Sequence, residues 1–155
     1  MDEIKVQDNS NTTVQYIVIR LGDEQYGINI TYVDNIVRMT NITRVPKVAP
    51  HLKGVINLRG IVIPVMSLRI KMGLEADEYT DKSRIIILKL EQQGTIGVIV
   101  DEVKEVITLN SDQVEKVATD TASSTEKTTF VQYVGKYNNE LVSILDLNAV
   151  TLEKE

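Results

Sequence analysis

The chain is 155 residues long, carries a net charge of −5, and contains no cysteine and only one histidine, His51. This composition excludes disulfides, Cys-ligated metal centres and metal sites that need two imidazoles. The acidic balance also disfavours a nucleic-acid binder, which usually carries a basic excess. The length suits one globular domain, or two small lobes that share a core.

β-Branched residues dominate the composition. The chain has 20 Val, 18 Ile and 14 Thr, so 52 of its 155 residues are β-branched, whereas Phe and Tyr together number 7 and Trp is absent. β-Branched side chains lose rotamer freedom in helices and pack well on a pleated sheet. The composition therefore predicts a mainly β protein with an aliphatic core.

Ten short apolar runs, separated by turn signals, are the predicted strands. Pro64 should place its strand at an edge or a bulge, because proline cannot donate to a strand ladder. Short helices are expected at Thr31–Asn35, Leu68–Met72 and Asn148–Glu153. The predicted strands are Val14–Leu21, Tyr26–Ile30, Asn41–Pro46, Gly54–Leu58, Ile61–Met66, Arg84–Leu90, Thr95–Asp101, Lys104–Leu109, Phe130–Tyr137 and Leu141–Leu145.

The two halves of the chain resemble each other. Tyr16–Ile36 aligns with Ile85–Val106, so that Gly27 falls on Gly97 and the aliphatic residues that follow also coincide. A second alignment places Ile63, Val65, Met66 and Leu68 on Val142, Ile144, Leu145 and Leu147. This repeat predicts two barrels of about five strands on a shared aliphatic core. The alternative is that the similarity is only that of any two β-meanders.

No catalytic or cofactor-binding constellation is present. Glycine-rich phosphate loops and a G-x-S-x-G elbow are absent. Asp101 and Glu102, and the acidic run at residues 75–78, could ligate a cation or act as acid and base, but solvated turn charges are the expectation. His51 should be a surface loop residue. We therefore expect no enzyme activity, no cofactor and no bound metal.

The segment Gly54–Leu68, with the sequence GVINLRGIVIPVMSL, places one arginine between apolar strands. In a tight connection Gly60 would supply a positive φ and Arg59 would point away from the core. Arginine on an apolar surface is a frequent interface anchor because its guanidinium is weakly hydrated and bonds bidentately. A turn arginine that simply faces water is the alternative.

Lys53–Arg69 closely resembles the signature K-G-V-I-N-L-R-G-x-V-I-P-V-x-x-L-R of the CheW-like domains of bacterial chemotaxis. Three further segments resemble the same family in the same order: YGINITYVDNIVRM at Tyr26–Met39 with the following ITRVP, I-G-V-I-V-D-E-V-x-x-V at Ile96–Val106, and LVSILDL at Leu141–Leu147. The resemblance spans residues 14 to about 150. It implies two SH3-like five-stranded barrels, as the internal repeat independently suggests.

The resemblance implies a non-enzymatic adaptor that couples chemoreceptor cytoplasmic tips to the histidine kinase CheA, whose regulatory domain has the same fold. The length leaves no room for the kinase or receiver domain of other family members, so we expect a stand-alone adaptor. We expect it to be a monomer on its own, bound to neither nucleic acid nor membrane. The start lacks a signal peptide and no apolar run could span a membrane, so we expect a cytoplasmic protein recruited to receptor arrays.

Carried over residue by residue, the family's receptor- and kinase-contacting positions are Val33, Asn35, Gly54, Arg59, Gly60 and Ile85. The family often has a glutamate where this chain has Asn35. An Arg–carboxylate pair is therefore in doubt, although Asn35 could still accept a hydrogen bond from Arg59. The expected organisation is a tail at residues 1–12, the double barrel at 13–150 and a tail at 151–155. The alternative function is a small-molecule or catalytic site in a groove between the barrels.

Overall fold

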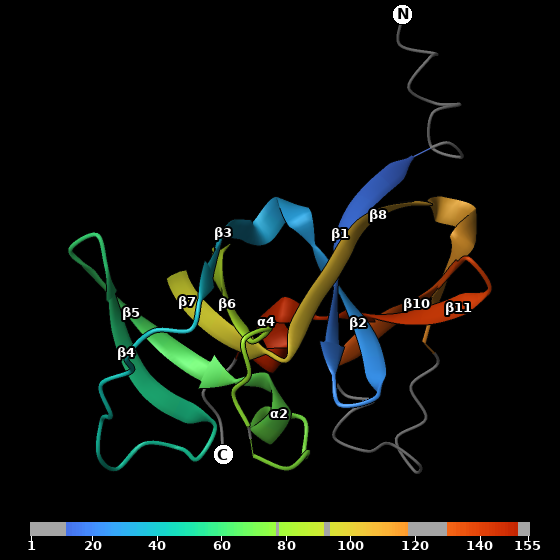
Figure 1. The fold of residues 1–155 in the computed structure, drawn as a ribbon. Helices are drawn as coiled ribbons and strands as arrows, with labels where there is room; N and C mark the ends of the chain where they lie inside the picture. Colours follow the sequence, from blue (N-terminus) through green and yellow to red (C-terminus); the bar gives the residue numbers. More distant parts are fainter. Residues whose placement is uncertain (1–11, 77, 92–93, 118–129, 152–155) are drawn as a thin grey trace, which may run out of the picture.

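The computed structural model describes residues 12–76, 78–91, 94–117 and 130–151. The predicted N-terminal tail at 1–12 lies almost wholly outside them, as do the Ser/Thr-rich residues 119–129. Within the described residues the chain forms eleven strands and two short helices (Figure 1). These are β1 (Thr13–Leu21), β2 (Glu24–Asn29), β3 (Val33–Arg38), β4 (Leu52–Leu58), β5 (Ile61–Ser67), α2 (Leu68–Lys71), β6 (Arg84–Leu90), β7 (Gly94–Val100), β8 (Glu102–Asn110), β9 (Val114–Lys116), β10 (Val131–Tyr137), β11 (Glu140–Leu145) and α4 (Leu147–Val150).

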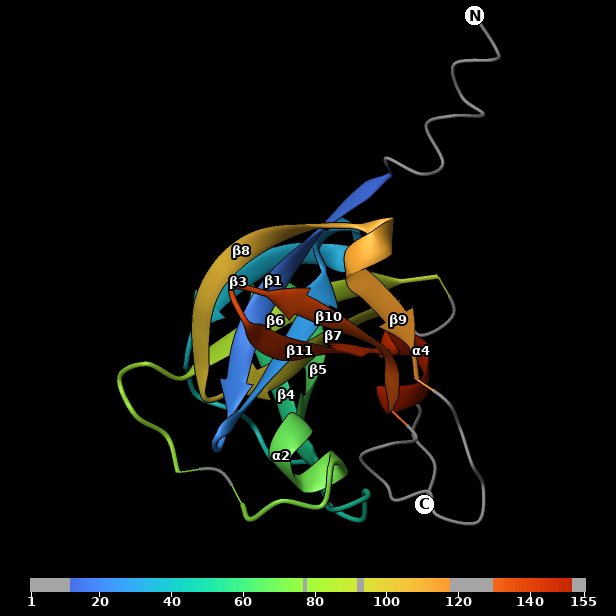
Figure 2. The ribbon, with the colours of Figure 1, turned by 90° about the vertical axis from the view of Figure 1, so that its right-hand side faces the viewer.

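The strands form two mixed sheets, which lie side by side in Figure 1. We call the sheet with strand order β8-β1-β2-β11-β10-β9 the first barrel, and the sheet with order β3-β6-β7-β5-β4 the second barrel. Figure 2 turns the first barrel towards the viewer. In each barrel a hairpin, β1–β2 or β6–β7, pairs in parallel with the last strand of a second hairpin, β11 or β5. The predicted fold class is therefore confirmed.

The barrels exchange one strand each. β3 follows β2 in the chain but pairs with β6 of the second barrel, and β8 follows β7 but pairs with β1 of the first. The internal repeat had aligned these two strands through Val33 and Val103. The repeated unit is thus three consecutive strands, of which the third crosses to the other barrel, and neither barrel is complete without both halves of the chain.

Each barrel has its own apolar interior, and a third cluster joins the barrels. On β1, Tyr16 and Val18 point into the first barrel, whereas Ile17, Ile19 and Leu21 point into the joint cluster. β6 divides in the same way, with Ile85 and Ile87 inside the second barrel and Ile86, Leu88 and Leu90 in the joint cluster. Successive strand residues face opposite sides of a sheet, so a strand buried on both faces must be apolar throughout. This explains why RIIILKL is so continuously aliphatic.

Gly27 and Gly97 occupy equivalent places in the two barrels, where the parallel strand passes. A Cβ at Gly27 would lie 2.9 Å from Ile144 Cδ1, and one at Gly97 would lie 2.8 Å from Ile85 Cγ2. Glycine within a strand often marks such a close approach. These two glycines therefore make room for interior isoleucine side chains of the neighbouring strand.

Both helices follow the strand that closes a barrel. Ser67 Oγ accepts a hydrogen bond from the N–H of Ile70 at the start of α2, and Asp146 Oδ1 accepts one from that of Ala149 at the start of α4. Serine and aspartate are favoured N-caps because their oxygens satisfy a free amide of the first turn. The helices predicted at Leu68–Met72 and Asn148–Glu153 are confirmed within the described residues, the second beginning one residue earlier.

Three predictions made from local sequence were wrong. Thr31–Asn35 is not a helix: only Ile30–Tyr32 forms a 3₁₀ turn, and β3 begins at Val33 because its β-branched residues pair with β6. Asn41–Pro46 is not a strand, since it joins the sheet only through a bridge between Thr43 and Val55. His51 is not on the surface: it is 7% exposed, and its carbonyl accepts a hydrogen bond from the Ser67 amide.

Pro64 lies in β5, between β4 and β7 in the sheet order. β5 pairs with β4 through Ile61–Met66, but with β7 only through Val65–Ser67. Pro64 therefore stands where β5 has a partner on one side only, and its missing amide costs no ladder hydrogen bond. β5 as a whole is not an edge strand, so the predicted edge position holds only for the part of β5 before Val65, which has no partner on the β7 side.

Candidate functional site

The turn between β4 and β5 has an unusual backbone. Leu58 pairs with Ile61, so only Arg59 and Gly60 form the loop, and their φ angles are +54° and +85°. A two-residue type I′ turn requires positive φ at both positions. The Gly60 amide donates to Asn57 Oδ1 at 2.9 Å, which fixes the turn further. The sequence predicted a positive φ at Gly60 but not at Arg59, because few residues other than glycine adopt one.

Two exposed aliphatic side chains flank this turn. Ile61 is 61% exposed and Val62 is 64% exposed. Val62 lies opposite Asn57 on the outer face of the hairpin, and Ile61 lies beyond the end of the barrel interior that begins at Ile63. The turn of this hairpin points outward at the left of Figure 1. We call Arg59, Ile61 and Val62 the hairpin tip.

The hairpin tip has the chemistry of a protein-binding surface. The guanidinium of Arg59 has no hydrogen bond or ion pair with any described residue. An arginine between exposed aliphatics can bury apolar area and bond bidentately to a carboxylate of a partner. Sequence analysis missed Ile61 and Val62. The available signal was an apolar run that continues without alternation up to the turn.

Gly54 belongs to the same hairpin but not to its surface. It is buried, has a φ of +143°, and a Cβ there would lie 2.0 Å from the carbonyl oxygen of Thr43. The glycine lets the segment through Thr43 and Arg44 cross β4 and form two backbone hydrogen bonds between Thr43 and Val55. This corrects the expectation that Gly54 lies on a contacting surface. A role in binding stays a prediction, and it would act through packing.

The remaining three predicted site residues lie on β3 and β6, at the opposite end of the strand order of the second barrel from β4. Val33 and Asn35 are half-buried on edge strand β3, where they pair with Leu88 and Ile87. Asn35 Oδ1 accepts a hydrogen bond from the Ile36 amide at 2.8 Å, and no bond joins it to Arg59. Ile85 is 0% exposed inside the second barrel, so its expected place on a surface is also corrected. The structure thus brings Arg59 and Gly60 together but not Val33, Asn35 and Ile85 with them.

The first barrel carries a matching hairpin. Asn138 and Asn139 form the β10–β11 turn with φ angles of +52° and +65°. The internal repeat aligns Leu141 with Val62, and Leu141 is 62% exposed. Each barrel therefore ends in a two-residue turn of the same kind beside an exposed aliphatic side chain. We call Asn138, Asn139 and Leu141 the second hairpin tip.

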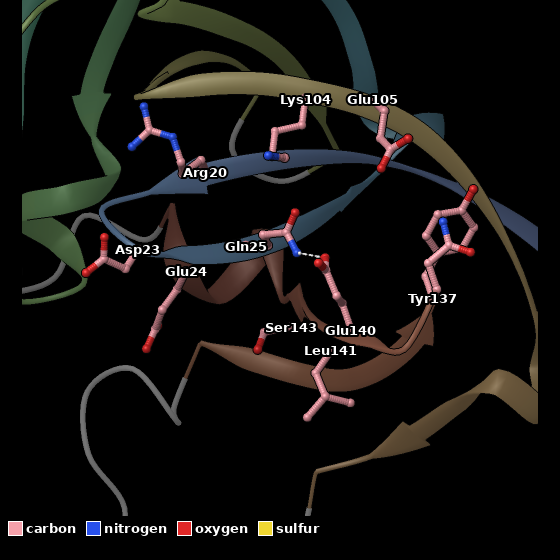
Figure 3. Close-up of a pocket in the computed structure, with 11 residues that line it drawn as sticks. Arg20, Asp23, Glu24, Gln25, Lys104, Glu105, Tyr137, Glu140, Leu141 and Ser143 are labelled. Atoms are coloured by element: carbon pink, nitrogen blue, oxygen red, sulfur yellow. Dashed lines mark hydrogen bonds between the residues drawn. The ribbon is translucent and has the colours of Figure 1, made fainter.

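A hollow of about 910 Å³ opens beside the second hairpin tip (Figure 3). It exists because β11 pairs with β2 only at Ser143 and Ile144, so the two strands separate towards the turn. Gln25 Nε2 bridges the opening to Glu140 Oε1 at 2.8 Å. The charged residues that line the hollow are Arg20, Lys104, Asp23, Glu24, Glu105 and Glu140. Four carboxylates against two cations make the hollow anionic.

The described residues offer binding chemistry rather than reactive groups. No group of three or more His, Asp or Glu side chains in this part of the chain could hold a metal ion. Tyr26 beside the hollow donates its hydroxyl to Glu24 Oε1 at 2.8 Å, and burial together with this bond raises the pKa of Tyr26 well above its usual value. A tyrosine that holds its proton so firmly cannot act as a base near neutral pH. No described helix is long and apolar enough to cross a membrane.

Comparison with known proteins gives consistent matches. A family model described as CheW-like domain matches residues 15–155. The chemotaxis protein CheW of Bacillus subtilis (strain 168) is 38% identical over 144 residues, which cover 93% of this chain and 90% of that protein. The CheW protein of Helicobacter pylori (strain ATCC 700392 / 26695) is 33% identical over 144 residues, covering 93% and 85%. The crystal structure of the scaffolding protein TtCheW from Thermoanaerobacter tengcongensis superposes with a TM-score of 0.80 at 32% identity, covering 90% of this chain and 92% of that one.

Proposed function

This chain belongs to the CheW-like domain family, and from that premise we propose that it is a non-enzymatic adaptor of bacterial chemotaxis. It couples the cytoplasmic tips of chemoreceptors to the histidine kinase CheA and so helps to regulate kinase activity in receptor arrays. The names of its relatives, chemotaxis protein CheW and scaffolding protein TtCheW, support this role. The proposed place of action is the cytoplasm, at membrane-associated arrays.

The hairpin tip is the observation that carries the proposal. Arg59, Ile61 and Val62 present a cation and two aliphatic side chains that are exposed in the isolated chain. A two-residue turn holds them, so little conformational entropy is lost when a partner binds. Two adjacent exposed aliphatic side chains beside an arginine form a small continuous apolar surface, which favours a role in recognition.

The second hairpin tip supports coupling of two partners. Val62 and Leu141 are almost equally exposed, at 64% and 62%, and lie on different barrels. A protein with two separate apolar contact surfaces can hold two partners at once, and contacts that are individually weak become stable in an array through multivalency. The described residues offer no activated nucleophile, which fits a scaffold better than an enzyme.

The test is a binding assay with purified CheA and a receptor cytoplasmic fragment. Arg59→Glu should abolish binding to one of the two partners, because the change removes an anchor and introduces a repulsive charge. Its circular-dichroism spectrum and Tm should stay close to those of the parent, since Arg59 makes no bond within the described chain.

Lys116→Glu is the matched control. Lys116 is an exposed lysine on β9 of the first barrel, away from both turns, so the same charge reversal there should leave both bindings unchanged. Binding of CheA and receptor by Arg59→Glu at parental affinity would contradict the role of the hairpin tip. Failure of the parent chain to bind either partner would contradict the proposed function itself.

A further inference from the structure

The chain passes from the second barrel back to the first through a single residue. β7 ends at Val100 in the second barrel, and β8 begins at Glu102 in the first, so Asp101 alone connects them. The passage in the other direction, from β2 to β3, runs through the 3₁₀ turn Ile30–Tyr32. Asp101 therefore lies where a rotation of one barrel against the other would have to be absorbed.

The Asp101 carboxylate bonds to both barrels. Oδ2 accepts a hydrogen bond from the Gly22 amide, in the β1–β2 turn of the first barrel, at 2.8 Å. The same oxygen accepts one from Arg69 Nη1 at 2.6 Å, and Arg69 lies on α2, directly after β5 of the second barrel. The Asp101 and Arg69 side chains are only 16% and 18% exposed. Sequence analysis had expected Asp101 to be a solvated turn charge, which is incorrect.

Further hydrogen bonds hold the β1–β2 turn and the Arg69 side chain in place around Asp101. Arg20 Nε donates to Glu102 Oε1 at 2.9 Å and Arg20 Nη1 donates to the carbonyl of Gly22 at 3.0 Å, so the β1–β2 turn is tied to the start of β8. Arg69 Nε donates to the carbonyl of Glu75 at 2.8 Å, which ties the segment after α2 to the same point. The pKa of Glu102 is lowered by its hydrogen bond with Arg20.

These bonds are directional, whereas the contacts of the joint cluster between the barrels are not. That cluster consists of aliphatic side chains with Tyr26, and apolar contact is non-directional. It holds the barrels together but fixes their relative rotation only through shape. Charge-assisted hydrogen bonds are directional, and a half-buried pair is screened less by solvent than an exposed one. A hollow of about 210 Å³, lined by Arg20, Arg69, Glu75 and Asp101 among others, adjoins the bonds and leaves these side chains room to separate.

We infer that Asp101 is a positioning residue: its carboxylate, shared between Gly22 and Arg69, sets the orientation of the two barrels relative to each other. The consequence for coupling rests on the proposed function. The two hairpin tips lie on different barrels, so a change of orientation alters the geometry between two partners without altering either surface.

The absence of native cysteine allows a direct test. Lys89→Cys on β6 and Lys136→Cys on β10 place one exposed spin label on each barrel, and pulsed electron paramagnetic resonance measures the distance between them. In the otherwise unchanged chain we expect one narrow distance distribution. Asp101→Ala should broaden it or shift its mean, because the hydrogen bonds of the carboxylate with Gly22 and Arg69 and its 3.8 Å ion pair with Arg20 are lost. Asp112→Asn, an exposed acid-to-amide change in the first barrel, should leave it unchanged.

A second pair of variants keeps the inference testable if Asp101→Ala does not fold. Arg69→Gln removes the ion pair that joins Asp101 to the second barrel but leaves its contacts with Gly22 and Arg20 in the first, so it should broaden the distribution. Arg69→Lys, which keeps the charge, should broaden it less. A folded Asp101→Ala or Arg69→Gln chain with the parental distance distribution would overturn the inference. This measurement uses the chain alone, so its outcome is independent of whether CheA or receptors bind.

A binding assay then separates positioning from general destabilisation. At a temperature where both chains are folded, Asp101→Ala should bind each partner alone with parental affinity but lose co-assembly of all three proteins. Equal loss in the single-partner and three-protein assays would show that Asp101 supports only stability, and would also overturn the inference.

Discussion

Gly54 gives the sharpest quantitative prediction. In Gly54→Ala the new Cβ would lie 2.0 Å from the Thr43 carbonyl oxygen, 2.7 Å from the Thr43 carbonyl carbon and 3.0 Å from Arg44 Cα. All three are backbone atoms, so the Asn41–Pro46 segment must move away from β4. That movement breaks two backbone hydrogen bonds, from Thr43 N to Val55 O at 2.8 Å and from Val55 N to Thr43 O at 2.9 Å.

The expected destabilisation is the sum of two effects. A φ of +143° is essentially restricted to glycine, and holding another residue there costs about 1–3 kcal/mol. The two lost hydrogen bonds cost about 1 kcal/mol each. Gly54→Ala should therefore lower the free energy of unfolding by about 3–5 kcal/mol, and should lower Tm by about 6–20 °C in a domain of this size.

Gly60→Ala is the matched comparison. Gly60 also has a positive φ, +85°, but a Cβ there meets no heavy atom within 4 Å. Only backbone strain remains, so the cost should be about 1–2 kcal/mol. Urea unfolding followed by circular dichroism measures both variants. Equal destabilisation of the two would refute the reasoning, because the close approach of Thr43 is then not what requires glycine at position 54.

Three further predictions concern Ile85, salt and pH. Ile85→Ala should lower the free energy of unfolding by about 2–5 kcal/mol, as should the control Ile87→Ala in the same interior. The affinity of the folded chain for its partners should change equally little in both variants. A loss of affinity in Ile85→Ala alone would show that Ile85 has a role in binding. Raising ionic strength from about 0.05 to 0.5 M shortens the Debye length from roughly 14 to 4 Å. A kinase contact made by aliphatic surface should therefore lose less than about tenfold in affinity, and a receptor contact through Arg59 should lose more. Titration calorimetry with each partner measures this difference, and a kinase affinity that collapses with salt would contradict it. Because the folded-state pKa of Tyr26 is raised, the stability that protonated Tyr26 contributes is present below about pH 10, the usual tyrosine pKa, and is lost as pH rises further. Ultraviolet titration should show Tyr26 ionising only when the chain unfolds in alkali. Ionisation of every tyrosine while the chain is still folded would contradict this.

The sequence alone determined the β class and the positions of most strands, because both follow from local patterns. RIIILKL at Arg84–Leu90 has no polar face, so it had to be buried on both sides, and the structure places its alternate residues in two different clusters. The two-residue connection at Arg59 and Gly60 was equally local, because turn geometry depends on its own residues. The internal repeat also predicted two equivalent units, and in each of them a glycine, Gly27 or Gly97, makes room for an isoleucine side chain of a neighbouring strand.

Tertiary structure decided what depends on residues distant in the chain. Val33–Arg38 became a strand rather than part of a helix because β6, about fifty residues later, offers it an edge. Two long-range pairings, β3 with β6 and β8 with β1, exchange these strands between the barrels, and no local pattern encodes either pairing. The burial of Gly54 depends on Thr43, and that of the Asp101 carboxylate depends on Gly22 and Arg69. Strand identity follows from periodicity, which is local, whereas exposure, ion pairing and the orientation of the barrels follow from contacts that form only when the whole chain has folded.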